Sequence, residues 1–172
     1  MLKQSNANVN VYVDALAASI ASVIAMSGDT IFMPKNSMLM VHNPSNIVWG
    51  NANDMRKAAD DLDKIGLSMQ QTYLAKAGDK LDQSTLQELM NNETWLSADD
   101  ALKYGLCDVI QEENKAAACV SKDLFSKYHN VPKSLLTPTN SITHLDMEKR
   151  KKIAEQARQN AEYTKTILGG IL

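Results

Sequence analysis

The segment Met38-Leu39-Met40-Val41 is apolar at every position, and this run constrains the fold more than any other stretch of the sequence. A strand that faces water on one side alternates apolar and polar residues, whereas a strand covered on both faces need not alternate. The turn residues Lys35-Asn36-Ser37 precede the run and His42-Asn43-Pro44 follow it, so its length suits a strand. We therefore predict an α/β fold with a sheet that is covered on both faces.

The clearest helix in the sequence runs from about Asn53 to Ala77. Apolar residues recur there every three or four positions, and charged residues occupy most of the other positions. The recurring apolar residues are Met55, Ala58, Ala59, Leu62, Ile65, Met69 and Tyr73. A helix of this length spans about 35–40 Å, which is more than a compact domain of this size needs. We expect part of it to project from the domain and to pack on another subunit.

Shorter elements fill the rest of the chain up to Ile110. A β-branched run at Val9–Val13 predicts a strand, which leads through small residues into a buried helix from about Ser19 to Ser27. Gly28 is predicted to end that helix in the left-handed conformation. The remaining predicted elements are a strand at Thr30–Met33, a helix at Asp82–Met90, an extended connection at Asn91–Leu96, a helix that Ser97 and Asp100 cap and Gly105 ends, and a closing strand at Leu106–Ile110.

The character of the sequence changes after Gln111. Glu112–Lys115 and the alanines that follow indicate a linker, Ser121–Tyr128 a short helix, and Val131–Thr139, with its two prolines, a loop. Asp146–Thr166 is mostly charged and helix-forming, which is typical of a solvated or partner-bound helix. We therefore divide the chain into one domain over residues 1–112 and a linker with a mostly helical C-terminal tail over residues 113–172.

Charge and composition argue against several classes of protein. The net charge is −2 at pH 7, which is unlike that of a protein that binds nucleic acid or an anionic membrane. The longest apolar run, Ala15–Met26, is about half as long as a membrane span. Cys107 and Cys119 form no C-x-x-C pair, and no Cys/His cluster has the spacing of metal ligands. We expect neither a metal nor a cofactor.

The beginning of the sequence does not have the pattern of a secretory leader. Ala15-Leu16-Ala17 could serve as a cleavage site, but polar residues occupy the positions where an apolar h-region should lie. These polar residues are Asn6, Asn8, Asn10 and Asp14. The two cysteines also fit a reducing compartment. We expect the protein in the cytoplasm.

Ser19 lies where the first predicted strand and the following helix meet, between small residues. A serine at such a turn projects its Oγ outward, and the free N–H groups of the helix face the negative charge that develops during attack on a carbonyl. The alternative is that Ser19 is an ordinary N-cap residue of the helix. Other residues of the chain are needed to distinguish these two interpretations.

Two further residue types complete a possible acyl-transfer site. His42 follows the apolar strand, and Glu93 lies in the extended connection before the capped helix. Together with Ser19 they would supply a nucleophile, a base that titrates near neutral pH, and an acid that holds the imidazole. The order alone proves nothing, because a chain of this length offers such a trio by chance and a histidine at a strand end is more often structural.

The sequence around these residues resembles that of a known family. The segments that carry the resemblance are Val11-Tyr12-Val13-Asp14-Ala15-Leu16-Ala17-Ala18-Ser19, Asn36–Pro44, Trp49–Asp54 and Glu93–Asp108. Together, and in this order, they resemble the proteolytic subunit of the Clp protease, and most closely its phage-borne branch of head maturation, or prohead, proteases. The resemblance extends from about Asn8 to Ile110.

The resemblance implies a fold, an activity and a set of roles. It implies the ββα superhelix shared by the Clp protease and crotonase families, here partial, and a serine endopeptidase active in phage capsid maturation in the cytoplasm of a bacterial host. Ser19 would be the nucleophile, His42 the base and Glu93 the acid, with the Ile20 N–H in the oxyanion hole. Asp108 would be the second candidate for the acid, and we expect it to be structural.

The same resemblance implies partners. The helix from Asn53 would be the handle that interlocks two rings of subunits, and an extended peptide or capsid protein would pair with the strand that includes Ser45, Asn46 and Ile47. An ATP-driven unfoldase is a further possible partner. The resemblance gives no role to a nucleic acid or a membrane.

One departure from the family pattern lies at the front of the sequence. The family has a Gly-Gly segment there that supplies the second oxyanion N–H and one wall of the substrate groove, whereas no glycine precedes Gly28 in this chain. We therefore expect an N-terminally truncated form that lacks the first repeats. Because loss of one oxyanion donor costs about 10²–10³ in turnover, we expect impaired peptidase activity.

Two alternatives from other functional classes remain. The chain could be a non-catalytic module that self-assembles or associates with a capsid through its long helix and charged tail. It could also be an acyl-CoA enzyme of the crotonase fold, whose oxyanion donors serve a thioester enolate and which needs no serine nucleophile. Absence of fluorophosphonate labelling with a defined oligomer would favour the first, and binding of a CoA thioester would favour the second.

Overall fold

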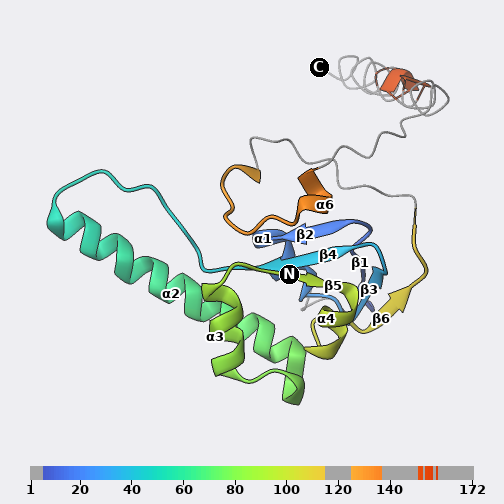
Figure 1. Ribbon diagram of the computed structural model, residues 1–172, viewed down its shortest axis with the longest axis horizontal. Coiled ribbons are helices and arrows are strands. Elements are labelled where there is room, and N and C mark those ends of the chain that lie inside the picture. The colour runs from blue at the N-terminus through green and yellow to red at the C-terminus, as the bar shows by residue number, and fades with distance from the viewer. Residues whose placement is uncertain (1–5, 115–124, 137–150, 153, 157, 159–172) are drawn as a thin grey trace, which may run out of the picture. The chain divides into compact units, whose positions relative to one another are not determined.

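The computed structural model describes residues 6–114, 125–136, 151–152, 154–156 and 158 (Figure 1). The chain divides into two compact units, Met1–Leu136 and Thr137–Leu172. The described residues of the second unit are helical. The rest of the helix predicted at Asp146–Thr166, and the first half of the short helix predicted at Ser121–Tyr128, lie outside the described residues.

The first unit begins with two successive strand–strand–helix repeats. The first repeat consists of β1 (Asn10–Tyr12), β2 (Leu16–Ala18) and α1 (Ile20–Ala25), and the second of β3 (Thr30–Pro34), β4 (Met38–Val41) and α2 (Ala52–Ala77). The elements that follow are the 3-10 helix η2 (Gly78–Lys80), α3 (Gln83–Asn91), β5 (Thr94–Ser97), α4 (Ala98–Lys103), β6 (Val109–Gln111) and α6 (Lys133–Leu136).

The strands form two three-stranded sheets, and each repeat gives one strand to each sheet. The first sheet has the order β1-β3-β6 and is parallel, with Val11 opposite Ile31 and Met33 opposite Ile110. The second has the order β2-β4-β5, in which β2 and β4 are parallel and β4 and β5 are antiparallel. The chain therefore has an α/β fold with parallel and antiparallel strand pairs.

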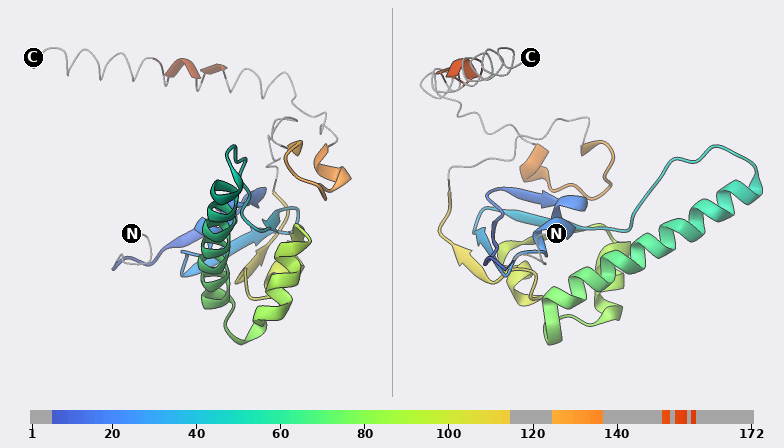
Figure 2. Two further views of the ribbon diagram at one scale, coloured as in Figure 1. Left: turned by 90° about the vertical axis from the view of Figure 1, so that its left-hand side faces the viewer. Right: turned by 180° about the vertical axis from the view of Figure 1, so that it is seen from behind.

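The central strand β4 confirms the prediction from the apolar run. Its residues Leu39, Met40 and Val41 are completely buried. Figures 1 and 2 show the strands of this unit between the helices α2 to α4 on one side and the segment from Phe125 to Leu136 on the other. An alternating sequence would place polar side chains in one of these two apolar layers.

The helix α2 begins at a capping box. The side chain of Asn51 accepts hydrogen bonds from the backbone N–H groups of Asn53 and Asp54, and the Asp54 carboxylate accepts one from the Asn51 N–H. The buried residues of the helix, Gly66, Gln70, Tyr73 and Ala77, all lie in its C-terminal half. Burial of α2 thus anchors one end of the helix only.

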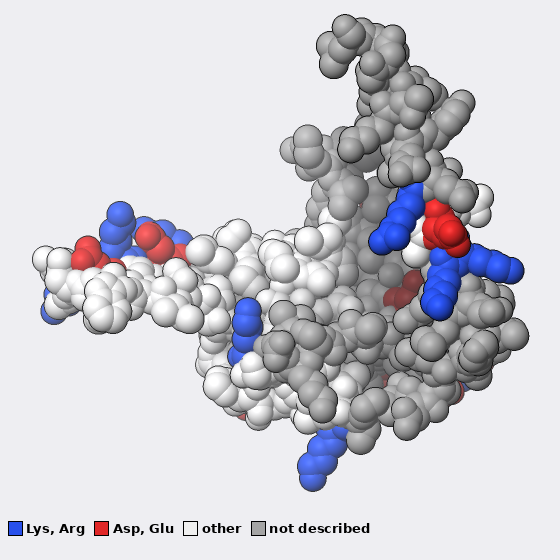
Figure 3. All heavy atoms as spheres, turned by 90° about the horizontal axis from the view of Figure 1, so that it is seen from above, with Lys and Arg blue, Asp and Glu red and all other residues white. Residues whose placement is uncertain are grey.

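The N-terminal part of α2 projects from the domain, as expected (Figures 1 and 2). Met55 and Ile65, which the sequence pattern places on the apolar stripe, are 53% and 50% exposed. Figure 3 shows acidic and basic side chains intermixed on this projection. The structure therefore leaves part of the predicted stripe uncovered within the described residues.

Several local predictions were wrong. A short strand, β2, lies between Val13 and Ser19, where the sequence predicted only a connection of small residues. Ser45–Val48 is not a strand, and Lys133–Leu136 is a short helix within a predicted loop. Gly28 does not have a positive φ; instead, a Cβ there would lie 2.7 Å from Val11 Cγ2, so glycine is needed for close approach. The predicted stop at Gly105 is confirmed by its φ of 71°.

Candidate active site

Strand pairing in the second sheet brings the three predicted catalytic residues to one end of that sheet. In the parallel pair, Ala18 of β2 lies opposite Met40 of β4, and Ser19 follows β2 directly. In the antiparallel pair, Val41 of β4 lies opposite Thr94 of β5. His42 comes after β4 and Glu93 before β5, so continuation of this register places them side by side.

Ser19 occupies a strained turn between β2 and α1. Its φ of 58° and ψ of −127° lie in a region that residues with a side chain rarely adopt. Ser19 is at the N-cap position of α1, but its side chain makes no capping hydrogen bond. The N-cap interpretation therefore does not explain the serine, whereas a sharp strand-to-helix turn is the usual setting of an exposed nucleophile.

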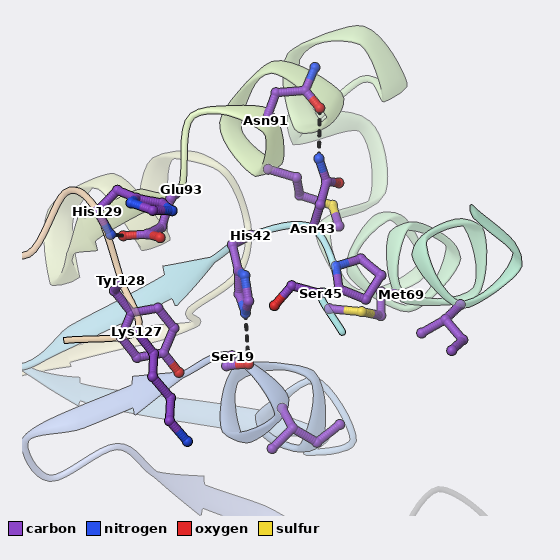
Figure 4. Close-up of a pocket in the computed structure, with 14 residues that line it drawn as sticks. Ser19, His42, Asn43, Ser45, Met69, Asn91, Glu93, Lys127, Tyr128 and His129 are labelled. Atoms are coloured by element: carbon purple, nitrogen blue, oxygen red, sulfur yellow. Dashed lines mark hydrogen bonds between the residues drawn. The ribbon is translucent and has the colours of Figure 1, made fainter. Parts of the chain in front are cut away.

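The Ser19 hydroxyl lies against the ring of His42. Ser19 Oγ and His42 Nε2 are 2.7 Å apart, which is a short hydrogen bond (Figure 4). With the proton on the other ring nitrogen, Nε2 accepts the hydrogen bond and can take the serine proton as a general base. The structure thus brings together two of the three predicted residues in a geometry suited to nucleophilic attack.

The surroundings of His42 favour its neutral form. Burial lowers the pKa of the ring below its ordinary value of 6.5, and the negative charge of Glu93 offsets part of this change. A neutral imidazole is the form that can accept a proton from serine. His42 is therefore in its basic form at neutral pH.

Glu93 lies at the same pocket, but its carboxylate bonds to other groups. Glu93 Oε1 accepts hydrogen bonds from the backbone N–H groups of His129 (2.8 Å) and Asn130 (2.9 Å), and from Trp95 Nε1 (3.4 Å). Within the described part of the chain, no hydrogen bond joins Glu93 to His42. Glu93 also has a positive φ, of 47°. Glu93 therefore lies near His42 but is not its hydrogen-bond partner in this structure.

A buried hydrogen-bond chain connects α2 to the turn at Ser19. The Ser22 hydroxyl donates to the Ser19 carbonyl oxygen at 2.6 Å, and the same oxygen of Ser22 lies 2.6 Å from the Tyr73 hydroxyl. Ser22 and Tyr73 are completely buried, and burial raises the pKa of Tyr73 to about 12. The sequence pattern identified Tyr73 only as a core residue, because a period of three to four cannot show which hydroxyl a tyrosine will meet.

Ser19, His42 and Glu93 line a pocket of about 500 Å³. Ile20 and Ser45, predicted for the oxyanion hole and for substrate binding, both line it, whereas Asn46 and Ile47 are exposed and not part of its lining. Ile20 is the first residue of α1, so its N–H has no acceptor within the helix. Apolar side chains of Ile65, Met69 and Met90 form another wall.

Residues 127–129 also line this pocket, and the sequence analysis did not connect them with the site (Figure 4). They lie beyond the last strand, in a stretch assigned to the tail. No local motif in Lys127-Tyr128-His129 signals a contact with His42 or Glu93, so only the tertiary structure could identify it.

Asp108 has the structural role that was expected of it. Its Oδ2 accepts hydrogen bonds from the Ile31 N–H at 2.7 Å and from Lys76 Nζ at 2.7 Å, which ties β3 to the last turn of α2. It is not among the residues that line the pocket. The second candidate for the triad acid is therefore engaged elsewhere.

Comparison with known protein families agrees with this geometry. A family model described as Clp protease matches residues 1–114, which is well over half of the chain. The chain belongs to the Clp protease family. The matched region contains Ser19, His42 and Glu93, and family membership indicates a serine peptidase. The α/β fold with its long α2 is consistent with a Clp protease domain, whereas residues 125–136 lie beyond the matched region.

Among the described residues of this Clp protease family member, no helix combines the length and the apolar character needed to cross a bilayer.

The lowered pKa of His42 predicts how reactivity at Ser19 depends on pH. Because the neutral ring is the active form and its pKa lies below 6.5, the rate of fluorophosphonate labelling should rise with pH, with a midpoint below 6.5. The measurement is the labelling rate from about pH 5 to about pH 8. Glu93→Gln removes the charge that raises the pKa of His42, so it should move the midpoint to lower pH. A wild-type midpoint above 6.5 would contradict the prediction.

Proposed function

We propose that this chain is a serine endopeptidase of the Clp type, with Ser19, His42 and Glu93 as its catalytic triad. The observation that carries the proposal is the 2.7 Å contact between Ser19 Oγ and His42 Nε2 at a strained strand-to-helix turn. His42 takes the proton as Ser19 attacks the scissile carbonyl and later gives it to the leaving amine. Glu93 holds the imidazole in the productive tautomer once its carboxylate reaches the other ring nitrogen.

The Ile20 N–H is proposed as one donor to the oxyanion of the tetrahedral intermediate. Its place beside Ser19 and in the pocket lining supports this role. An extended peptide is proposed to pair with the backbone of Ser45, Asn46 and Ile47, because these residues form no strand pair among the described residues. The apolar wall formed by Ile65, Met69 and Met90 would receive an apolar side chain of the peptide.

The proposal includes self-association through α2. The exposed apolar side chain of Met55 on its projecting part, and those of Ile65 and Leu67 further along the helix, support it, because exposed apolar side chains are available for burial in a protein interface. A role in phage prohead maturation, in the cytoplasm of a bacterial host, rests on the resemblance of the segments Val11–Ser19, Trp49–Asp54 and Glu93–Ser97. An ATP-driven unfoldase remains a proposed partner from the same resemblance.

Fluorophosphonate labelling tests the proposal directly. The probe forms a covalent adduct only with a serine that a neighbouring base activates. We expect one adduct, which peptide mass spectrometry maps to Ser19 and not to Ser45, a serine in the same pocket. An adduct at Ser45, or none at either serine, would contradict the proposal.

A non-catalytic assembly module of the same fold is the second candidate. The exposed apolar side chains of α2 favour it as much as they favour an oligomeric enzyme. Sedimentation of the labelled protein distinguishes the two. A defined oligomer without any adduct would support the module, and an oligomer with an adduct at Ser19 would support the peptidase.

A further inference from the structure

The segment Phe125–Asn130 packs onto the active site through aromatic rings. Phe125 is 6% exposed, and its ring centroid lies 6.2 Å from that of Trp95. The Tyr128 ring meets Trp95 edge to face at 5.9 Å and His42 edge to face at 5.6 Å. Figure 4 shows Tyr128 beside His42. These are favourable aromatic geometries, so they fix the segment against the site.

The backbone of the same segment holds the Glu93 carboxylate. The N–H groups of His129 and Asn130 both donate to Glu93 Oε1, at 2.8 Å and 2.9 Å. Asn130 Nδ2 also donates to the carbonyl oxygen of Asn92 at 2.7 Å. Hydrogen bonds to a charged carboxylate are about twice as strong as those between neutral groups. The segment therefore binds Glu93 and the residue before it.

In this position the Glu93 carboxylate makes no hydrogen bond to His42 within the described residues. Among the residues that the structure describes, the only hydrogen bond of the His42 ring is the one to Ser19. A triad acid acts through a hydrogen bond to the other ring nitrogen, which fixes the tautomer and stabilises the imidazolium. Glu93 and His42 line the same pocket, and the charge of Glu93 acts on the ring without a hydrogen bond between them.

We infer that Phe125–Asn130 is an autoinhibitory latch, which holds the Glu93 carboxylate on its own backbone N–H groups and so keeps it from His42. The inference rests on the proposed function, because it takes Glu93 as the triad acid. When the segment leaves the site, the carboxylate loses two donors and turns to the His42 ring. The same departure removes Tyr128 from the pocket that contains Ser19.

The opposite role for the same contacts is that of a clamp, in which the two N–H donors hold the carboxylate in its working position. The two roles predict opposite effects on the reactivity of Ser19 when the segment is loosened. A clamp must already present Glu93 to His42, and loosening it lowers reactivity. A latch withholds Glu93, and loosening it raises reactivity. The unbonded His42 ring favours the latch.

Proline at position 129 provides the test, because proline has no N–H to donate to Glu93. The matched control is His129→Ala, which removes the same side chain and keeps the N–H. We expect fluorophosphonate labelling of Ser19 to be about 10-fold faster in His129→Pro than in His129→Ala, which corresponds to loss of one charge-assisted hydrogen bond. Slower or equal labelling in the proline variant would overturn the latch.

A second variant tests the latch without introducing a proline, so its result does not depend on whether His129→Pro folds correctly. Phe125→Ala removes an anchor that contacts Trp95 and leaves the backbone N–H groups of the segment in place. It should accelerate labelling relative to Phe125→Leu, which keeps an apolar side chain. A decrease in Phe125→Ala would count against the latch as strongly as a decrease in His129→Pro.

The pKa of His42, measured by NMR titration, separates failure of the latch from failure of the proposed function. A hydrogen bond from the ring to Glu93 stabilises the imidazolium, so release should raise this pKa in both loosened variants. The other titratable groups that line the pocket are Lys127, Tyr128 and position 129, and the last is identical in the Phe125 pair. A raised pKa with no labelling in any variant would retain the latch and reject the peptidase. An unchanged or lowered pKa would reject the latch.

Discussion

Alanine at Ser19 is expected to abolish fluorophosphonate labelling, and alanine at His42 is expected to slow it by about 10⁶-fold. The reason is the contact between Ser19 Oγ and His42 Nε2, since the serine needs that base to become a nucleophile at neutral pH. The same two substitutions should lower hydrolysis of a fluorogenic peptide ester to a common background. The measurements are the rate of labelling and the rate of ester hydrolysis.

The double variant provides the sharper criterion. Residues that act as one unit are not additive, so Ser19→Ala with His42→Ala should hydrolyse the ester no more slowly than Ser19→Ala alone. Ser45 lies in the same pocket and makes no hydrogen bond to a base within the described residues, so Ser45→Ala is a control for the effect of removing a hydroxyl. Hydrolysis that survives in Ser19→Ala would show that the activity comes from another group.

Alanine at Tyr73 is expected to lower the free energy of unfolding by about 3–5 kcal/mol. Tyr73 is completely buried where α2 meets the core, and its loss leaves a cavity and removes a partner of Ser22. Tyr73→Phe keeps the ring and should cost about 1 kcal/mol for the lost hydrogen bond. Ser22→Ala leaves the buried Tyr73 hydroxyl unpaired and should cost about 1–3 kcal/mol. Urea denaturation followed by circular dichroism measures all three values.

Tyr12→Ala is the matched control for this series. Tyr12 is 54% exposed and stacks on Phe32 with the ring centroids 4.7 Å apart. Its removal opens no internal cavity, so it should cost less than about 1.5 kcal/mol. If Tyr73→Ala and Tyr12→Ala had the same cost, Tyr73 would not be part of the core that the structure describes.

The parts of the fold that sequence patterns could predict are those in which neighbours along the chain determine the outcome. The run Met38–Val41 has no polar residue to place in water, and Ser97 with Asp100 satisfies the first N–H groups of α4 within a single turn. The strand β2 was missed because Leu16-Ala17-Ala18 has no β-branched residue. Only its pairing with Met38–Met40 makes it a strand.

The candidate site was predictable only as far as its motifs extend. Ser19 and His42 lie in segments that resemble a family, and the structure brings their side chains into contact. The positions of Phe125–Asn130 depend on aromatic contacts with Trp95, which lies 30 positions earlier in the sequence than Phe125, and no local pattern encodes such a contact. The apolar period of α2 likewise shows which residues share a face, and not whether anything covers Met55 and Ile65.

The two residues with side chains at positive φ among those described are Ser19 and Glu93. Each such conformation costs about 1–3 kcal/mol, and glycine would adopt either at little cost. A selection for thermal stability alone would therefore favour glycine at the two positions where the proposed chemistry needs a hydroxyl and a carboxylate. Stability and activity are in conflict at these two positions, and engineering of a more stable variant should leave both unchanged.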